Sequence, residues 1–134
     1  MSKRREYEER FRERYGAPVA NAMLVIEREV IGANVGANGY TTIEQVNMLA
    51  DRLGLHADTT LLDLGSGRGW PALYVAREVG CQTTLLDMPE PALRTAMRQK
   101  DKQNLANVSI IQGTADRLPL RHDTFDAITH TDTL

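Results

Sequence analysis

The sequence predicts an α/β fold in which short parallel strands alternate with helices. Short apolar runs recur in the second half of the chain, and segments with helical spacing separate them. Gly65, Gly67 and Gly69 follow the first of these runs, where a strand is expected to turn into a helix. The first 57 residues differ in character and are predicted to form helices.

The most informative segment is LLDLGSGRGW, residues 61–70. A buried strand is predicted over 61–64, and a helix is predicted from Pro71 to Val79. Glycines let the backbone turn sharply and let a ligand approach main-chain atoms, and the N–H groups that start the helix suit a nucleotide-like ligand. We therefore expect a nucleoside-containing cofactor at this turn.

The spacing of these glycines bears on which cofactor is bound. The dinucleotide fingerprint G-x-G-x-x-G requires a third glycine at position 70, where this chain has Trp70. The observed spacing is G-x-G-x-G, with Asp63 two residues before the first glycine. A pyrophosphate site is therefore disfavoured, but one glycine loop is weak evidence and the following elements must decide.

Three further strands are predicted in order. The second covers 83–86 and ends at Asp87, and an acid at the tip of a second parallel strand is placed to bind ribose hydroxyls. A helix follows over about 89–104. The third strand covers 108–112, and the fourth covers 125–130.

Four segments, LLDLGSGRGW, LLDM, GTADRLPL and FDAITHTD, together resemble the class I S-adenosylmethionine-dependent methyltransferases over roughly 58–134. The resemblance implies S-adenosyl-L-methionine as cofactor and a Rossmann-like parallel sheet in strand order 3-2-1-4. It also implies truncation after the fourth strand, because the family usually has seven. The chain then divides into an N-terminal helical cap or lid segment, 1–57, and an incomplete cofactor-binding core, 58–134.

The resemblance assigns roles to residues near the methionine and ribose parts of the cofactor. Asp63 would support the glycine turn and the cofactor amino group, and Asp87 would bind the ribose hydroxyls. The methionine part would be contacted by the residues of the glycine turn, Gly65, Ser66, Gly67 and Gly69.

The resemblance also assigns roles near the adenine and the methyl group. Met88 would lie against the adenine face, and Asp116, beside Ala115, would accept a hydrogen bond from the adenine amino group. Thr129 and His130 would face the methyl group and the acceptor. His130 is the candidate catalytic residue, and no metal site is predicted.

Structural alternatives exist for these residues. Asp63 could cap the turn, but an acid in an apolar strand is costly unless it is paired. Asp87 could be a helix N-cap, Asp116 an ordinary turn residue and Met88 a core residue. His130 could be purely structural, as a lone histidine near a strand end often is.

The N-terminal segment is predicted to hold three helices. Tyr7, Phe11 and Tyr15 recur at i, i+4 and i+8 and form an apolar stripe on a charged helix. A second helix is predicted from about Pro18 to Ile31, and a third from an N-cap at Thr42 to Leu53 with a capping box. These helices are expected over the carboxyl ends of the strands, where open α/β sheets bind ligands.

The glycine-rich loop between the second and third predicted helices contains Tyr40. This side chain could contact the methionine end of the cofactor, or it could simply anchor the loop. The glycine hinges around it would suit a lid that closes to exclude water.

Composition limits the classes of partner. The chain has 134 residues and a formal net charge of −2, so nucleic acid binding has no general electrostatic support. No apolar span has membrane length, and the single cysteine, Cys81, fits a reducing, cytoplasmic compartment. The edge of the fourth strand would be unpaired, so the chain is either a fragment of a longer protein or self-associates there.

Methyl transfer from a sulfonium mainly requires a nucleophile aligned in a dry site, and a base is needed only for a protonated acceptor. His130 and Asp132 are the nearby candidates for that base. The fourth strand does not continue into an Asn/Asp-Pro-Pro-aromatic motif, which disfavours methylation of bases or glutamine. The sequence therefore favours a methyltransferase acting on a small molecule. The alternatives are a non-catalytic S-adenosylmethionine-binding module and a nucleotide-dependent oxidoreductase.

Overall fold

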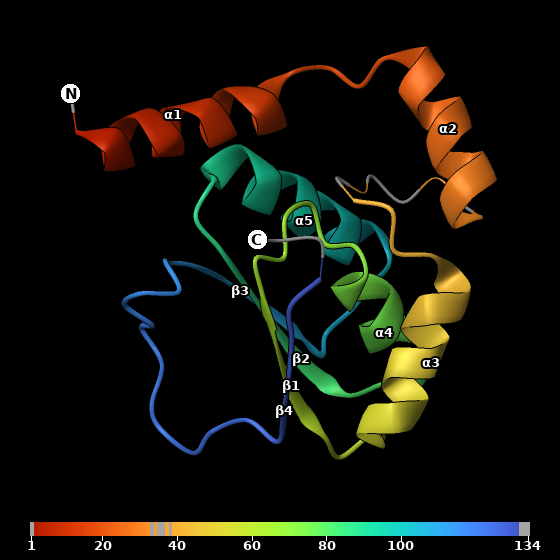
Figure 1. Ribbon diagram of the computed structural model, residues 1–134. Coiled ribbons are helices and arrows are strands. Elements are labelled where there is room, and N and C mark those ends of the chain that lie inside the picture. Colours follow the sequence, from red (N-terminus) through yellow and green to blue (C-terminus); the bar gives the residue numbers. More distant parts are fainter. Residues whose placement is uncertain (1, 33, 35–36, 38, 132–134) are drawn as a thin grey trace.

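The computed structural model describes residues 2–32, 34, 37 and 39–131. Three helices precede the first strand, and from there strands and helices alternate up to the third strand (Figure 1). In chain order the elements are α1 (Lys3–Gly16), α2 (Asn21–Ile31), α3 (Ile43–Leu53), β1 (Thr60–Leu64), α4 (Ala72–Val79), β2 (Gln82–Asp87), α5 (Glu90–Lys102), β3 (Val108–Gln112) and β4 (Ala127–Thr129).

The four strands form one parallel sheet in the order β3-β2-β1-β4, which confirms the predicted fold class and strand order. Helices α4 and α5 lie on one side of the sheet, and the segment 113–126 runs on the other (Figure 1). Because all four strands are parallel, their carboxyl ends meet at one edge. Residues that follow β1, β2, β3 and β4 are thereby brought together.

The core beneath α4 and α5 depends on small side chains. Ala72 and Ala76 of α4 and Ala96 of α5 are at most 1% exposed, and they pack against Leu85 and Val108 of the sheet. Alanine lets the helices approach the sheet closely, so both helices are held firmly over β1, β2 and β3.

A second core cluster joins the N-terminal helices to the sheet. Ile31 at the end of α2 and Val46 of α3 are buried with Leu61, Trp70 and Val75. The sequence analysis placed the N-terminal helices over the carboxyl ends of the strands, but α3 instead packs beside α4. Helix α1 does extend over that edge, as the contacts of its side chains show below.

The ends of the N-terminal helices follow local chemistry. The predicted capping box starts α3: the Gln45 amide donates to Thr42 Oγ1 at 3.1 Å, and the Thr42 amide donates to Gln45 Oε1 at 2.9 Å. Helix α2 begins at Asn21, three residues later than predicted. Pro18 disfavours helical geometry at Ala17, and both Ala17 and Ala20 are extended.

Strand β4 is shorter than the predicted 125–130. At its start the Asp126 carboxylate accepts hydrogen bonds from the backbone amide and the hydroxyl of Thr60, at 2.9 and 3.0 Å. At its end the His130 ring, rather than the His130 amide, contacts Leu64 O. At the start of β4 these bonds add to the backbone hydrogen bond from Asp126 N to Thr60 O at 2.9 Å, and at its end the His130 side chain makes the contact with β1.

None of the helices in the described part of the chain has the length and apolar character that crossing a membrane requires.

Candidate functional site

A groove of about 360 Å³ lies at the carboxyl ends of the strands, beneath α1. It combines residues from the ends of the strands with the inner face of α1. The strand ends and the segments after them contribute Leu64, Gly65, Leu86, Asp87, Met88, Gly113, Thr114, Ala115, Asp116 and His130, and α1 contributes Arg4, Tyr7, Glu8, Phe11 and Tyr15. Five of the residues that the sequence predicts for the cofactor, Gly65, Asp87, Met88, Ala115 and Asp116, therefore lie around one space.

The glycine loop is fixed to the end of β2. The amides of Gly65 and Ser66 both donate to Leu86 O, at 2.8 and 3.2 Å. Gly69 has a φ of +106°, and a Cβ there would lie 2.5 Å from Leu73 Cδ1 of α4. Only glycine therefore permits both the turn and the close approach of α4 to it.

Trp70 lies in the hydrophobic core and not between the glycine loop and α4, where its place in the motif suggested that it would lie. Its indole is 9% exposed, belongs to the core cluster with Ile31 and Val46, and donates from Nε1 to Thr41 O at 2.9 Å. The indole thus does not separate the loop from α4. Gly69, one residue earlier, provides the close helix packing that a third glycine would provide in the dinucleotide fingerprint.

The Asp87 carboxylate connects β2 to the glycine loop. Its Oδ2 accepts a hydrogen bond from the Gly67 amide and its Oδ1 accepts one from the Met88 amide, both at 2.7 Å. Bonds of this length to a carboxylate are charge-assisted and strong. They hold the two oxygens in a fixed orientation at the wall of the groove.

Asp63 and Thr129 form a buried pair behind the loop. The Thr129 hydroxyl donates to Asp63 Oδ1 at 2.7 Å. Asp63 is 2% exposed and Thr129 is 9% exposed. Burial raises the pKa of Asp63 to about 7, because its negative form loses hydration, and the Thr129 hydrogen bond only partly opposes this. Thr129 was predicted to face the methyl group, but its hydroxyl points into the interior toward Asp63.

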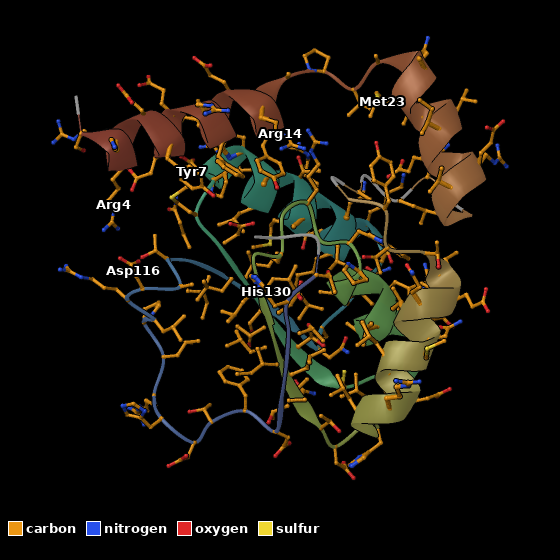
Figure 2. All side chains as sticks on the ribbon, in the orientation of Figure 1. Arg4, Tyr7, Arg14, Met23, Asp116 and His130 are labelled. Carbon is orange, nitrogen blue, oxygen red and sulfur yellow. The ribbon has the colours of Figure 1, made fainter. Side chains whose placement is uncertain are left out.

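Asp116 lies opposite α1. Arg4 Nη1 is 3.4 Å from Asp116 Oδ2, and Figure 2 shows Arg4 projecting from α1 toward this carboxylate. The pKa of Asp116 is lowered, first by a hydrogen bond from the Thr114 side chain and also by the charge of Arg4. Asp116 is thus an exposed, ionised carboxylate at the rim of the groove.

His130 lies in the groove at the end of β4, and its Nδ1 is 3.1 Å from Leu64 O. A carbonyl oxygen can only accept a hydrogen bond, so Nδ1 must carry the proton. In the neutral ring Nε2 is then the atom with a free lone pair. The geometry fits a proton acceptor, while the catalytic role of His130 stays a prediction.

The aromatic stripe of α1 forms part of the groove, although the sequence analysis did not assign it to the site. The ring centroids of Tyr7 and Phe11 are 4.5 Å apart, and those of Phe11 and Tyr15 are 6.1 Å apart. No residue of α1 is buried, and Tyr7 is 50% exposed. The i, i+4, i+8 spacing was the signal, and only the folded chain shows what the stripe faces.

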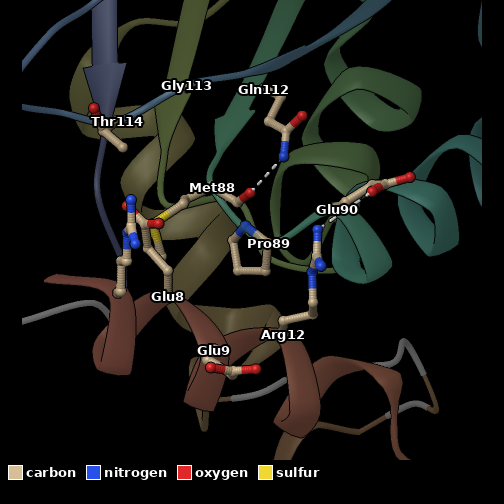
Figure 3. Close-up of a pocket in the computed structure, with 10 residues that line it drawn as sticks. Glu8, Glu9, Arg12, Met88, Pro89, Glu90, Gln112, Gly113 and Thr114 are labelled. Atoms are coloured by element: carbon tan, nitrogen blue, oxygen red, sulfur yellow. Dashed lines mark hydrogen bonds and ion pairs between the residues drawn. The ribbon is translucent and has the colours of Figure 1, made fainter. Parts of the chain in front are cut away.

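The groove continues on the far side of Met88 into a space of about 480 Å³, shown in Figure 3. The two share Glu8, Met88, Gly113 and Thr114. In this extension Gln112 Nε2 donates to Met88 O at 2.9 Å, which fixes the loop after β2. Arg12 of α1 meets Glu90, the first residue of α5, at 3.8 Å.

Several proposed site residues do not line the groove or lie outside the described chain: besides Asp63, Gly67, Gly69 and Thr129, described above, these are Tyr40, Ser66 and Asp132. Tyr40 is 59% exposed and lines a separate cavity beside α2. Ser66 is 2% exposed, and its Oγ has no hydrogen-bond partner among the described residues. Asp132, the second candidate base, lies outside the described residues.

Comparison with known proteins gives consistent results. Glycine/sarcosine/dimethylglycine N-methyltransferase from Actinopolyspora halophila is 30% identical over 86 residues, which is 62% of this chain and 15% of the relative. A SAM-dependent methyltransferase from Aquifex aeolicus is 27% identical, with a TM-score of 0.58 over 63% of this chain and 46% of that one.

A SAM-dependent methyltransferase from Thiobacillus denitrificans, solved with S-adenosyl-L-homocysteine, is 23% identical and shows the same fold. Its TM-score is 0.64 over 87% of this chain and 45% of that one. The chain thus spans 15% of the length of the first relative and less than half of either structure.

Residues 61–134 match the family described as "Methyltransferase domain". This match covers more than half of the chain and contains the glycine loop, Asp87, Asp116 and His130. The chain therefore belongs to the methyltransferase domain family, as the sequence motifs predicted.

Proposed function

We propose that this chain binds S-adenosylmethionine in the groove beneath α1 and acts as the cofactor-binding part of a methyltransferase for a small molecule. The observation that carries the proposal is the convergence of Gly65, Asp87, Met88, Asp116 and His130 around one groove. These residues come from the ends of all four strands or from the segments that follow them. The family resemblance assigned a cofactor or acceptor contact to each of them.

The residues present fit this cofactor. An ionised carboxylate can accept about four hydrogen bonds, and the amides of Gly67 and Met88 supply two to Asp87, so lone pairs remain for two ribose hydroxyls. Asp116 offers a carboxylate acceptor in the same groove as Met88.

The bound cofactor would supply a methyl group on a sulfonium, which is already a good leaving group. The work of this chain is then to hold the reactants and exclude water. His130 Nε2 would accept a proton where the acceptor carries one at neutral pH. A small acceptor is supported by the relative from Actinopolyspora halophila, which is named for glycine, sarcosine and dimethylglycine.

Residues 1–57 would serve as the cap of this site. Helix α1 supports this role, because its aromatic stripe lines the groove and Arg4 and Arg12 make polar contacts with residues around it. These exposed ion pairs contribute little stability. Helix α3, packed beside α4, would instead anchor the cap to the core.

Calorimetric titration of the chain with S-adenosylmethionine, S-adenosylhomocysteine and NAD tests the proposal. We expect micromolar binding of the two sulfur compounds and none of NAD. Asp87→Asn should weaken their binding about 10- to 100-fold, since hydrogen bonds to a charged acceptor are worth about 1.5–3 kcal/mol. Asp101→Asn, at an exposed position near the end of α5, is the matched control and should leave affinity unchanged.

Binding of NAD alone would favour the oxidoreductase alternative and contradict the proposal. A folded chain that binds none of the three compounds would also contradict it. Binding without methyl transfer to any of a range of small acceptors would favour the non-catalytic binding module.

A further inference from the structure

Asp63 is a buried carboxyl group directly behind the groove. It is 2% exposed, and the two residues that follow it in the chain, Leu64 and Gly65, both line the groove. The Thr129 hydroxyl donates to its Oδ1 at 2.7 Å, and His130, the residue after Thr129, lines the groove as well. Asp63 thus lies behind the wall of the groove and is not part of the wall itself.

The charges of groove-lining residues reach Asp63. The carboxylate of Asp87 on β2 raises the pKa of Asp63, and the charge of His130 after β4 lowers it. Among the described residues these are the titratable groups that act on Asp63, one from each strand that flanks β1. Charges are screened little inside a protein, so a charge carried by a ligand in the groove would act on Asp63 in the same way.

The empty chain favours the neutral form of Asp63. Burial raises its pKa to about 7, and the hydrogen bond from Thr129 offsets only part of the lost hydration. The Asp87 carboxylate, held by the amides of Gly67 and Met88, adds a like charge nearby. A second negative charge beside Asp87 is therefore unfavourable until a positive charge enters the groove.

S-adenosylmethionine and S-adenosylhomocysteine differ by one such charge. Both carry an amino group and a carboxylate, but only S-adenosylmethionine carries a positively charged sulfur. A nearby cation favours the ionised form of a carboxyl group. The substrate cofactor would therefore favour ionised Asp63 more strongly than the product would.

We propose that Asp63 distinguishes S-adenosylmethionine from S-adenosylhomocysteine by charge: it is neutral in the empty chain and ionises when the sulfonium enters the groove. This inference rests on the proposed function. On binding, the O–H bond of the carboxyl group breaks, its electron pair stays on oxygen and the proton passes to water. Methyl transfer then removes the sulfonium charge, Asp63 takes a proton back from water, and its contribution to binding is lost with the product.

The ratio of two affinities tests this inference. The chain is titrated by calorimetry with S-adenosylmethionine and S-adenosylhomocysteine between about pH 5.5 and 7, below the range in which an α-amino group titrates. Because binding of S-adenosylmethionine releases a proton, a higher pH favours it. We expect its affinity relative to S-adenosylhomocysteine to rise about three- to tenfold, since a change of one unit in the pKa of Asp63 corresponds to about tenfold in affinity.

Variants assign the effect to Asp63. Asp63→Asn cannot ionise, so the affinity ratio should become nearly independent of pH. Thr129→Val removes the hydrogen bond that favours the ionised form, so it should move the rise in the ratio to higher pH. This second variant tests the inference even if Asp63→Asn does not fold. Asp101→Asn, at an exposed position on α5, is the matched control and should keep the wild-type pH dependence.

The number of protons released gives an independent measurement. It is obtained by repeating the titrations at about pH 6.5 in two buffers that differ in ionisation enthalpy. The wild-type chain should release more protons with S-adenosylmethionine than with S-adenosylhomocysteine. This difference should disappear in Asp63→Asn and remain in His130→Gln. A purely structural role for Asp63 would not change the number of protons.

The outcomes separate this inference from the function beneath it. If the wild-type affinity ratio does not change with pH, the inference is wrong and the cofactor site stands. The same holds if the change survives in Asp63→Asn but is lost in His130→Gln, which would make His130 the group that responds to the sulfonium. If the folded chain binds neither compound, the proposed function fails and this inference fails with it.

Discussion

Asp63 combines a position behind the glycine loop with an energetic cost. The side chain lies in β1, two residues before the glycine loop, and is 2% exposed. Within the described part of the chain, its side chain accepts a hydrogen bond from the Thr129 hydroxyl on β4. The pair joins the two strands directly behind the loop, so the position of Gly65 depends on it. The protein therefore keeps an acid where an apolar residue would be more stable.

This cost predicts a specific pH dependence. The folded-state pKa of Asp63, about 7, lies above the unfolded value near 3.9, so the folded chain binds this proton more tightly. The stability that the proton contributes is complete below about pH 4 and is lost as the pH rises to 7, with a loss on the order of a few kcal/mol. Asp63→Asn, which keeps an acceptor for Thr129, should gain stability relative to wild type across that window. Urea unfolding at several pH values measures the difference.

Asp126 provides a control of opposite sign. Hydrogen bonds from the Thr60 backbone and side chain lower the pKa of Asp126, so its contribution is present at neutral pH and is lost as the pH falls. Asp126→Asn should therefore lose stability relative to wild type at pH 7 and approach it at low pH. If the difference in unfolding free energy between Asp63→Asn and wild type stays constant between pH 4 and 7, the Asp63 carboxyl is ionised in the folded chain over that range.

Single residues also show what the sequence could not predict. The motif located Asp87 and Asp116 because their distance from a strand end is fixed by local chain geometry. Tyr40 belongs to none of the four motifs, so its position in the cavity beside α2 could not be predicted from motif spacing. Thr129 is one residue before His130, and only the alternation of β4 decides which of them points inward.

At the scale of elements, the contact between the glycine loop and α4 is the tightest constraint on the site. Gly69 and Gly80 both have positive φ, +106° and +79°. They differ in their surroundings: a Cβ at Gly69 would lie 2.5 Å from Leu73, whereas nothing lies within 4 Å of one at Gly80. Before α4, both packing and backbone conformation therefore restrict which residue can occupy position 69. After α4, backbone conformation alone restricts position 80.

This difference predicts the effects of two substitutions. Gly80→Ala should destabilise the fold by about 1–2 kcal/mol, the cost of a left-handed alanine. Gly69→Ala adds overpacking, so it should cost about 1–3 kcal/mol more and should also weaken binding of S-adenosylhomocysteine. Chemical denaturation and calorimetry measure the two effects. Equal destabilisation by the two variants would mean that α4 can shift freely, and the loop would not be fixed as described.

The predicted elements succeed where local signals are strong. The third strand was predicted with its observed bounds, 108–112, and the N-cap of α3 was predicted at Thr42, because periodicity and a capping box act within a few residues. The fourth strand was predicted too long, because Asp126 and His130 have strand-like neighbours although the described strand covers only Ala127–Thr129, and His130 contacts β1 through its ring. A sequence pattern does not distinguish a backbone partner from a side-chain partner 66 residues away.

At the scale of the whole molecule, the sheet is protected unevenly. On one edge, β3 packs against α5. Asn107, just before β3, accepts a hydrogen bond from the Thr83 amide of β2. On the opposite edge β4 pairs with β1 alone among the described residues, and Ile128 at its centre is 56% exposed. An unpaired edge presents free N–H and C=O groups, and an exposed isoleucine adds apolar surface to it. These features favour addition of another strand at β4.

We therefore expect the isolated chain to self-associate through β4 at high concentration. Ile128→Lys should reduce association several-fold, because a lysine at a strand edge opposes pairing with a second copy through charge repulsion and loss of apolar contact. Met48→Lys is the matched control, since Met48 is comparably exposed, at 48%, but lies on α3, away from the edge. Sedimentation velocity over a hundredfold range of concentration measures the effect. A chain that stays monomeric throughout, or equal effects of the two lysines, would contradict association through β4. Titration with S-adenosylhomocysteine should leave the association unchanged, because the groove lies at the carboxyl ends of the strands and the associating surface lies along the side of β4.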